Sequence, residues 1–174
     1  MLRHISDCYS VNKHSLNPFN LILYDVGENL YTSLAKNNLD KWIGIKCVKK
    51  GEYDSLKDFI QKFNTDTTSV NDITDKQIVY LTADSQNEIH ELKQDEVYII
   101  GGIVDRNRFK CLTINKADNL GINHGKLPIG EFIDLKSTKV LTTNHVFNIL
   151  SYFNSKEKNW KEAFLSIIPK RKFD

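Results

Sequence analysis

The sequence predicts an α/β fold with a mostly parallel sheet flanked by helices. Short runs of apolar and β-branched residues alternate with segments of helical periodicity along the chain, as in parallel strands joined by crossover helices. Residues 97–100 (Val-Tyr-Ile-Ile) are all suited to a strand buried inside such a sheet. The 174 residues, 40% of them hydrophobic, are enough for one domain with a substantial core.

The apolar pattern places the elements in order. Strands are expected over residues 19–24, 42–48, 78–82 and 97–100. Helices are expected over residues 2–14, 28–38, 55–63, 85–92 and 109–120. Gly121 follows the last of these, where a left-handed residue commonly ends a helix. The polar residues 64–76 are expected to form a surface loop. A final helix should begin at Asn159, in capping-box spacing to Glu162, and stop at Pro169.

Two further segments come before that final helix. Residues 126–130 are expected to be extended, because the residue before Pro128 avoids helical angles. Residues 140–142 are expected to form a short strand. Thr143 or Asn144 can cap the amphipathic helix that comes next.

Composition excludes several classes of protein. The three cysteines are far apart and form no CxxC pair, and the five histidines are scattered, so neither a disulfide framework nor a metal site is expected. No apolar run approaches the roughly 18 residues that span a bilayer. An intracellular protein without a membrane segment is expected. The motifs GxGxxG, GxxxxGK[ST], GxSxG and HExxH are absent, which disfavours dinucleotide-binding dehydrogenases, P-loop enzymes and serine hydrolases.

The glycine pair Gly101-Gly102 and Asp105 concentrate the candidate chemistry. In parallel sheets the loop at the carboxyl end of a strand is where ligands bind, and glycines let a ligand approach the main chain. Asp105 would then lie beside that ligand. The alternative is a tight turn between a strand and a helix, with Asp105 capping the helix.

Basic residues are clustered although the net charge is only +2. The clusters are Lys46/Lys49/Lys50, Arg106/Arg108/Lys110, Lys156/Lys158/Lys161 and Lys170/Arg171/Lys172. They fit either solvated helix faces and ends or, if several surround one cleft, contacts to phosphates.

Five motifs in order resemble one family, the tRNA (guanine-9-N1) methyltransferases, which form the Trm10 branch of the SPOUT class. The motifs are Val79–Ser85, Tyr98–Asp105, Lys126–Glu131, Val140–Val146 and Ile168–Lys172. Cys8–Asn12 resembles a family helix more weakly, because Lys13 and His14 stand where the family has two arginines. The family usually also has a strand and a basic extension before this helix.

The resemblance implies a SPOUT-type fold with a C-terminal trefoil knot, formed by residues 1–174 as a single methyltransferase domain lacking the family's usual N-terminal extension. It implies S-adenosylmethionine as cofactor, S-adenosylhomocysteine as product and N1 of guanosine 9 in tRNA as acceptor. It also implies a monomer in the nucleus, the cytoplasm or both. Three alternatives are N1 methylation of adenosine 9, a non-catalytic tRNA-binding subunit of a processing complex, and an ordinary class I methyltransferase. The missing glycine-rich first loop disfavours the last.

The resemblance also assigns site residues. The cofactor-binding residues it implies are Leu81, Gly101, Asp105, Arg106, Asn107, Arg108, Phe109, Thr113, Leu127, Lys139, Val140 and Leu141. Thr113 stands where the family commonly has cysteine. Phosphate contacts to tRNA are expected from Arg106, Arg108, Lys110 and Lys126. Thr142, Asn144 and His145 are expected to support these residues.

Asp105 is the candidate catalytic residue, as the base that accepts the N1 proton. An aspartate with an ordinary pKa of about 3.9 is a weak base, and the neighbouring arginines would lower its pKa further. A second role therefore stays open, in which Asp105 accepts a hydrogen bond from the base edge and orients it.

Overall fold

The computed structural model covers all 174 residues, and the described parts are residues 1–66, 73–103, 111–135, 140–155 and 158–173. The strands are β1 (Leu21–Val26), β2 (Ile45–Lys49), β3 (Ile78–Leu81), β4 (Val97–Ile100) and β5 (Asn123–Gly125). The helices are α1 (Leu2–Lys13), α2 (Glu28–Lys36), α3 (Leu56–Asp66), α4 (Leu112–Leu120), α5 (Ile129–Phe132), α6 (Thr143–Ser155) and α7 (Trp160–Ile167). Short 3₁₀ helices are η1 (Leu39–Lys41), η2 (Asp75–Gln77) and η3 (Lys170–Lys172). None of the described helices has the length and apolar character needed to cross a membrane.

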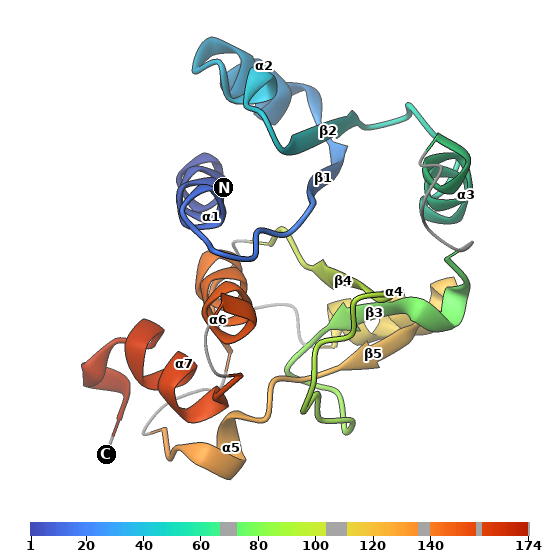
Figure 1. The fold of residues 1–174 in the computed structure, drawn as a ribbon. Coiled ribbons are helices and arrows are strands. Elements are labelled where there is room, and N and C mark those ends of the chain that lie inside the picture. Colours follow the sequence, from blue (N-terminus) through green and yellow to red (C-terminus); the bar gives the residue numbers. More distant parts are fainter. Residues whose placement is uncertain (67–72, 104–110, 136–139, 156–157, 174) are drawn as a thin grey trace.

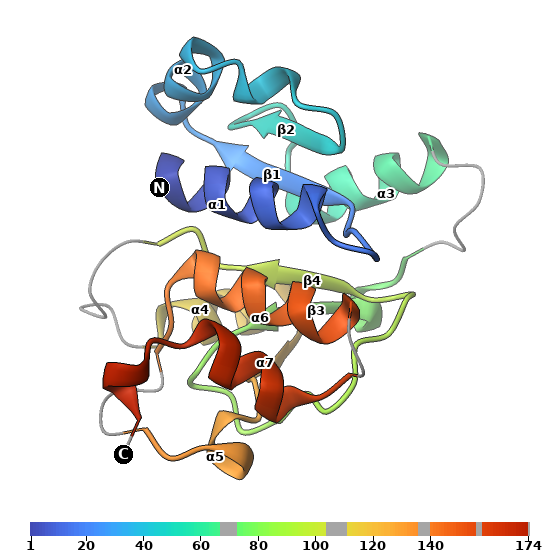
Figure 2. The same ribbon diagram turned by 60° about the vertical axis from the view of Figure 1, so that its left-hand side comes forward.

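All strand pairs in the described residues are parallel, as expected, but they form two sheets instead of one (Figure 1). One sheet pairs β1 with β2. The other has the order β4-β3-β5, and Leu81 lies opposite both Ile100 and Gly125. The carboxyl ends of these three strands therefore meet at one edge. Figure 2 shows the two-stranded sheet above the three-stranded one.

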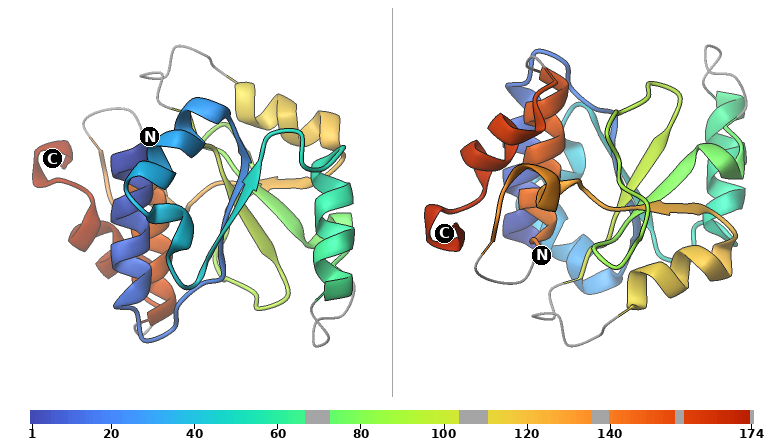
Figure 3. Two further views of the ribbon diagram at one scale, coloured as in Figure 1. Left: turned by 90° about the horizontal axis from the view of Figure 1, so that it is seen from above. Right: turned by 90° about the horizontal axis from the view of Figure 1, so that it is seen from below.

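Helices cover both sides of the strands, as the sequence predicts. α1, α6 and α7 lie on one side, and α3 and α4 lie on the other (Figure 3). β3 is buried at all four positions because its side chains alternate between two cores. Val79 and Leu81 pack with the α6–α7 cluster, whereas Ile78 and Tyr80 pack with the cluster that includes Ala117 of α4.

The buried central strand is β3 and not residues 97–100, where the sequence analysis expected it. β4 lies at the edge of the three-stranded sheet, and its residues are half-buried. The predicted helix ends are better matched. Gly121 ends α4 with a φ of +64°, and the Asn159 side chain accepts the backbone N–H of Glu162 at the start of α7.

The predicted helix over residues 85–92 is wrong. The segment is extended, because the Ile89 N–H donates to the Lys126 carbonyl (2.9 Å) and the Lys126 N–H donates to the Asn87 carbonyl (2.8 Å). Gly125 leaves room for this packing, since a Cβ there would lie 2.7 Å from Ile89 Cδ1. The spacing of Ile89 and Leu92 reflects packing of an extended chain on the α6–α7 cluster.

The predicted strand over residues 140–142 is also wrong. The Thr142 carbonyl accepts the Val146 N–H (3.0 Å) as the first acceptor of α6, so this backbone leads into a helix. Residues 126–130 are extended only up to Pro128, because Ile129 begins the short helix α5.

Other boundaries shift for local reasons. Strand β1 begins at Leu21 instead of residue 19, because the Asn12 side chain binds both the N–H and the carbonyl of Phe19 at 2.8 Å. β2 begins at Ile45, after a turn at Gly44 with a φ of +86°. α3 extends to Asp66, three residues into the predicted loop, whose residues 67–72 lie outside the described part.

Candidate active site

A cavity lies where β3 and β4 end and where the chain enters α4, α5 and α6. It is lined by Leu81, Thr82, Ala83, Asp84, Ile100, Gly101, Ile103, Leu112, Thr113, Lys126, Leu127, Ile129, Val140, Leu141, Thr143 and Val146. Most of these side chains are aliphatic, with a few hydroxyl and charged groups between them. This composition is typical of a site for a small organic ligand with a few polar groups.

The structure brings together the part of the predicted cofactor set that it describes. Leu81, Gly101, Thr113, Leu127, Val140 and Leu141 all line this cavity, and so does Lys126 from the predicted tRNA-contact set. The remaining predicted residues lie outside the described parts of the chain: Asp105, Arg106, Asn107, Arg108, Phe109, Lys110 and Lys139. Segments distant in sequence therefore converge on one cavity.

Gly101 is packed tightly between α4 and α6. A Cβ at this position would lie 3.2 Å from Thr113 Cγ2, closer than most real Cβ contacts. The Thr143 hydroxyl donates to the Gly101 carbonyl at 2.9 Å. The start of α6 is thus fixed to the turn after β4, and glycine is needed there to let α4 approach.

Polar residues that the sequence analysis did not select form one wall of the cavity. The Thr113 hydroxyl donates to Thr82 Oγ1 at 2.7 Å, and the Asp84 N–H donates to the same oxygen at 3.3 Å. Asp84 Oδ2 accepts the Cys111 N–H at 3.1 Å. Thr82 and Asp84 directly follow β3, so the rule that ligands bind at strand carboxyl ends would have found them.

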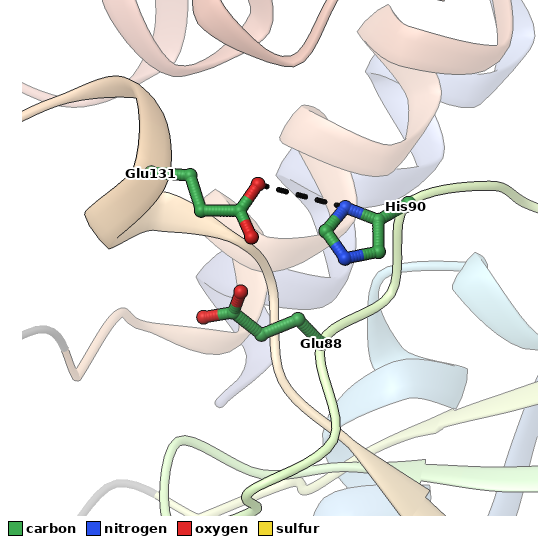
Figure 4. Close-up of side chains that lie close together, drawn as sticks. All are labelled: Glu88, His90 and Glu131. Atoms are coloured by element: carbon green, nitrogen blue, oxygen red, sulfur yellow. Dashed lines mark ion pairs between the residues drawn. The ribbon is translucent and has the colours of Figure 1, made fainter.

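Lys126 is held near an acidic group outside the cavity. Lys126 Nζ lies 3.6 Å from Glu88 Oε1. Close by, His90 Nδ1 lies 3.6 Å from Glu131 Oε2 (Figure 4). A hydrogen bond between the two carboxyl groups raises the pKa of Glu131 and lowers the pKa of Glu88.

Among the described residues, one group of side chains could hold a metal ion. It consists of Glu88, His90 and Glu131, whose ligand atoms lie within 4.8 Å of one another. The sequence analysis expected no metal and could not see this group, because residues 88 and 131 meet only through the backbone pairing of Glu88 with Lys126. The Lys126 ammonium competes with a cation for Glu88.

Residues 142–145 connect the cavity to α1. Asp7 Oδ2 accepts hydrogen bonds from Asn144 Nδ2 (2.8 Å) and Asn148 Nδ2 (3.1 Å). The pKa of His145 is lowered by burial, and further by the nearby charge of Lys172. Lys172 Nζ donates to the Val140 carbonyl at 3.4 Å, so the C-terminal segment supports the cavity wall. Asn144 and His145 are half-buried, whereas Thr142 is exposed and its hydroxyl donates to Asn144 Oδ1 at 2.7 Å.

Comparison with known proteins decides the family. Residues 1–173 match the family described as tRNA (guanine(9)-N(1))-methyltransferase TRM10/TRM10A. The chain belongs to the Trm10 family. The chain is 39% identical over 175 residues to the tRNA methyltransferase 10 homolog A of Xenopus tropicalis, covering 98% of this chain and 46% of that protein. It is 37% identical to the tRNA (guanine(9)-N1)-methyltransferase of Schizosaccharomyces pombe, covering 99% of this chain and 52% of the relative.

The fold agrees with Trm10 crystal structures. A crystal structure of spTrm10 in complex with SAH superimposes with a TM-score of 0.78 at 36% identity, covering 98% of this chain and 83% of that one. The chain spans about half the length of the curated Trm10 relatives it matches. The described residues of the cavity all lie within residues 1–173, the segment that matches the Trm10 family.

Proposed function

We propose that this protein is an S-adenosylmethionine-dependent methyltransferase that modifies N1 of guanosine 9 in tRNA. The observation that carries the proposal is a cavity at the ends of β3 and β4, lined by residues of the motifs that resemble the family. Membership of the Trm10 family and similarity to spTrm10, whose structure contains SAH, support the same function.

The residues of the cavity fit this cofactor. Leu81, Leu127 and Leu141 offer aliphatic walls for an adenine ring. The threonines that line the cavity offer hydroxyl oxygens as acceptors for hydroxyl or ammonium groups. Bound S-adenosylmethionine supplies an electrophilic methyl group on its sulfonium.

Asp105 is assigned to the N1 proton of guanine. Since N1 carries a proton in the neutral base, this proton has to leave as the bond from N1 to the methyl carbon forms. Asp105 accepts it, or alternatively accepts the N1–H hydrogen bond and orients the base. General-base catalysis of this kind is typically worth about 10²–10⁴-fold in rate.

Binding of tRNA is assigned to Lys126 together with Arg106, Arg108 and Lys110. The target base has to leave its stack to reach the cavity, at a cost of about a few kcal/mol. Phosphate contacts release counterions, so tRNA affinity should fall steeply with added salt. Lys126→Ala should lower the salt slope by about one. Filter binding at several salt concentrations measures this slope, and affinity independent of salt contradicts the assignment.

Other properties of the proposal follow the family resemblance. We infer a C-terminal trefoil knot, since the bends after β4, after β5 and before α6 meet at one cavity. A crystal structure tracing residues 103–111 and 135–140 tests the knot. We further place the reaction in the nucleus or cytoplasm, where tRNA is processed, and propose that the enzyme acts as a monomer without a metal.

The deciding experiment combines two measurements on the full chain. Calorimetry with S-adenosylhomocysteine tests the cavity, and methyl transfer to tRNA transcripts with G or A at position 9 tests the reaction. Binding with transfer to G9 supports the proposal. Absence of binding overturns it, and tRNA binding without transfer indicates a non-catalytic subunit. Methyl transfer only to transcripts with A at position 9 would show that the acceptor is adenosine 9 and not guanosine 9.

A further inference from the structure

Asp84 links two segments of the cavity wall that are far apart in the sequence. It follows β3 in a turn, its side chain is exposed, and it lines the cavity. Its Oδ2 accepts the Cys111 N–H at 3.1 Å, across 27 positions of the chain. A hydrogen bond to a charged acceptor is stronger than one between neutral groups. This bond therefore fixes Cys111 relative to the end of β3.

Cys111 needs such a contact because its backbone is strained. It has a φ of +56° and a ψ of 8°, the left-handed region that residues with a Cβ rarely adopt. It is the residue directly before α4, so its conformation sets the direction in which the chain enters that helix. The Asp84 carboxylate offsets the strain by binding the N–H that this conformation directs toward it.

The first turn of α4 forms the cavity wall next to this contact. Leu112 and Thr113, the first two residues of α4, both line the cavity. The Thr113 hydroxyl binds Thr82, which also accepts the Asp84 N–H. Thr113 Cγ2 lies against Gly101, where even one added methyl group would be 3.2 Å away. A small shift of this turn would therefore change the shape of the cavity.

We propose that Asp84 is a positioning residue, which holds Cys111 in its left-handed conformation and thereby places Leu112 and Thr113 against the cofactor. The proposal rests on the proposed function in one respect only, the identity of the ligand. The placement of α4 can be measured without it.

The experiment compares four variants by calorimetry with S-adenosylhomocysteine and by hydrogen exchange of the α4 amides. Asp84→Ala should weaken cofactor binding about tenfold and speed exchange in the first turn of α4. Asp84→Asn keeps an acceptor oxygen and should retain most of the affinity. Asp84→Ala combined with Cys111→Gly should recover most of the loss, because glycine adopts a positive φ without strain. Asp134→Ala, which removes another exposed carboxylate, is the control.

The two readouts separate the possible failures. If Asp84 instead binds the cofactor directly, Cys111→Gly gives no recovery and exchange in α4 is unchanged, and the positioning role is overturned. If the parent protein binds no S-adenosylhomocysteine, the proposed function fails. The exchange rates then still decide whether Asp84 positions α4.

Discussion

The two sheets of this protein are both parallel, and a cavity lies at the carboxyl end of the three-stranded one. β1 is mostly half-buried, and beyond it the Lys50 N–H donates to the Val26 carbonyl at 2.9 Å. This bond continues the parallel pairing of the two strands to the end of the two-stranded sheet. At the ends of β3 and β4, by contrast, Asp84 and Gly101 line the cavity. Parallel strand ends alone do not make a binding site, because the residues that follow each strand determine whether a cavity forms there.

The lysines near the two sheets also differ in their surroundings. Lys49 Nζ lies 3.9 Å from the centre of the Tyr31 ring, and Lys46 Nζ lies 5.1 Å from that of Phe63. These lysines of β2 pack over aromatic rings. Lys126, in contrast, lines the cavity. The sequence analysis left solvated helix faces and phosphate contacts open for the basic clusters, and the structure places Lys46 and Lys49 on strand β2, beside aromatic rings.

The largest expected effect tests whether the two sheets differ in how much they stabilise the fold. Ile78→Ala in β3, where the side chain is 1% exposed, should lower the free energy of unfolding by about 3–5 kcal/mol. Ile22→Ala in half-buried β1 removes the same atoms and should cost only about 1–2 kcal/mol. Urea denaturation of both variants measures the difference. Equal costs would show that the two strands are equally important to the core.

The next effect concerns two carboxylates, Asp105 after the apolar segment 97–100 and Asp25 within β1. Asp105→Asn should keep cofactor affinity and lower the methyl-transfer rate at least tenfold at neutral pH, because the amide cannot accept the N1 proton. Asp25→Asn, at the end of β1, is the matched control and should leave the rate unchanged. Single-turnover assays across a range of pH measure both. A variant at residue 105 as fast as the parent at every pH removes Asp105 as the base.

How far the sequence could predict this structure depends on whether a pattern is local. β3, α6 and α7 follow from their own apolar spacing, and Gly121 and Asn159 mark helix ends by local geometry. The segment 85–92 could not be predicted, because Ile89 and Leu92 have the same spacing in a helix as in this extended chain. Only pairing with Lys126, 37 positions beyond Ile89, decides between them.

The same limit applies to the candidate site. Motifs identified the residues that line the cavity from β3, β4 and the segment before α6. The contact of Asp84 with Cys111 and the group of Glu88, His90 and Glu131 depend on pairings across the sheet. No spacing in the sequence predicts these pairings, because each residue of such a pair is an ordinary surface residue by itself.

A smaller effect is expected from closing the space beside Gly101. Gly101→Ala should weaken cofactor binding about three- to tenfold, since the added Cβ would lie 3.2 Å from Thr113 Cγ2 and push α4 outward. Adding Thr113→Ser should restore affinity, because serine lacks Cγ2 but keeps the hydroxyl that binds Thr82. Gly27→Ala, after β1, has no atom within 4 Å of the new Cβ and is the control. Calorimetry that finds no recovery in the double variant contradicts this account.

The smallest expected effect is on the pH dependence of stability, through His145 of α6. Burial and the charges of Lys172 and His4 lower the pKa of His145, although Asp7 opposes them. Below pH 6.5 the unfolded chain therefore takes up a proton at His145 before the folded chain does, and stability falls as the pH decreases through the lowered pKa. His145→Gln should remove this part of the pH dependence and leave stability above pH 7.5 little changed. His14→Gln, at the exposed end of α1, is the matched control for replacing a histidine with glutamine. Urea midpoints from pH 5 to 8 measure both, and a constant offset between parent and His145→Gln would show that His145 acts by packing alone.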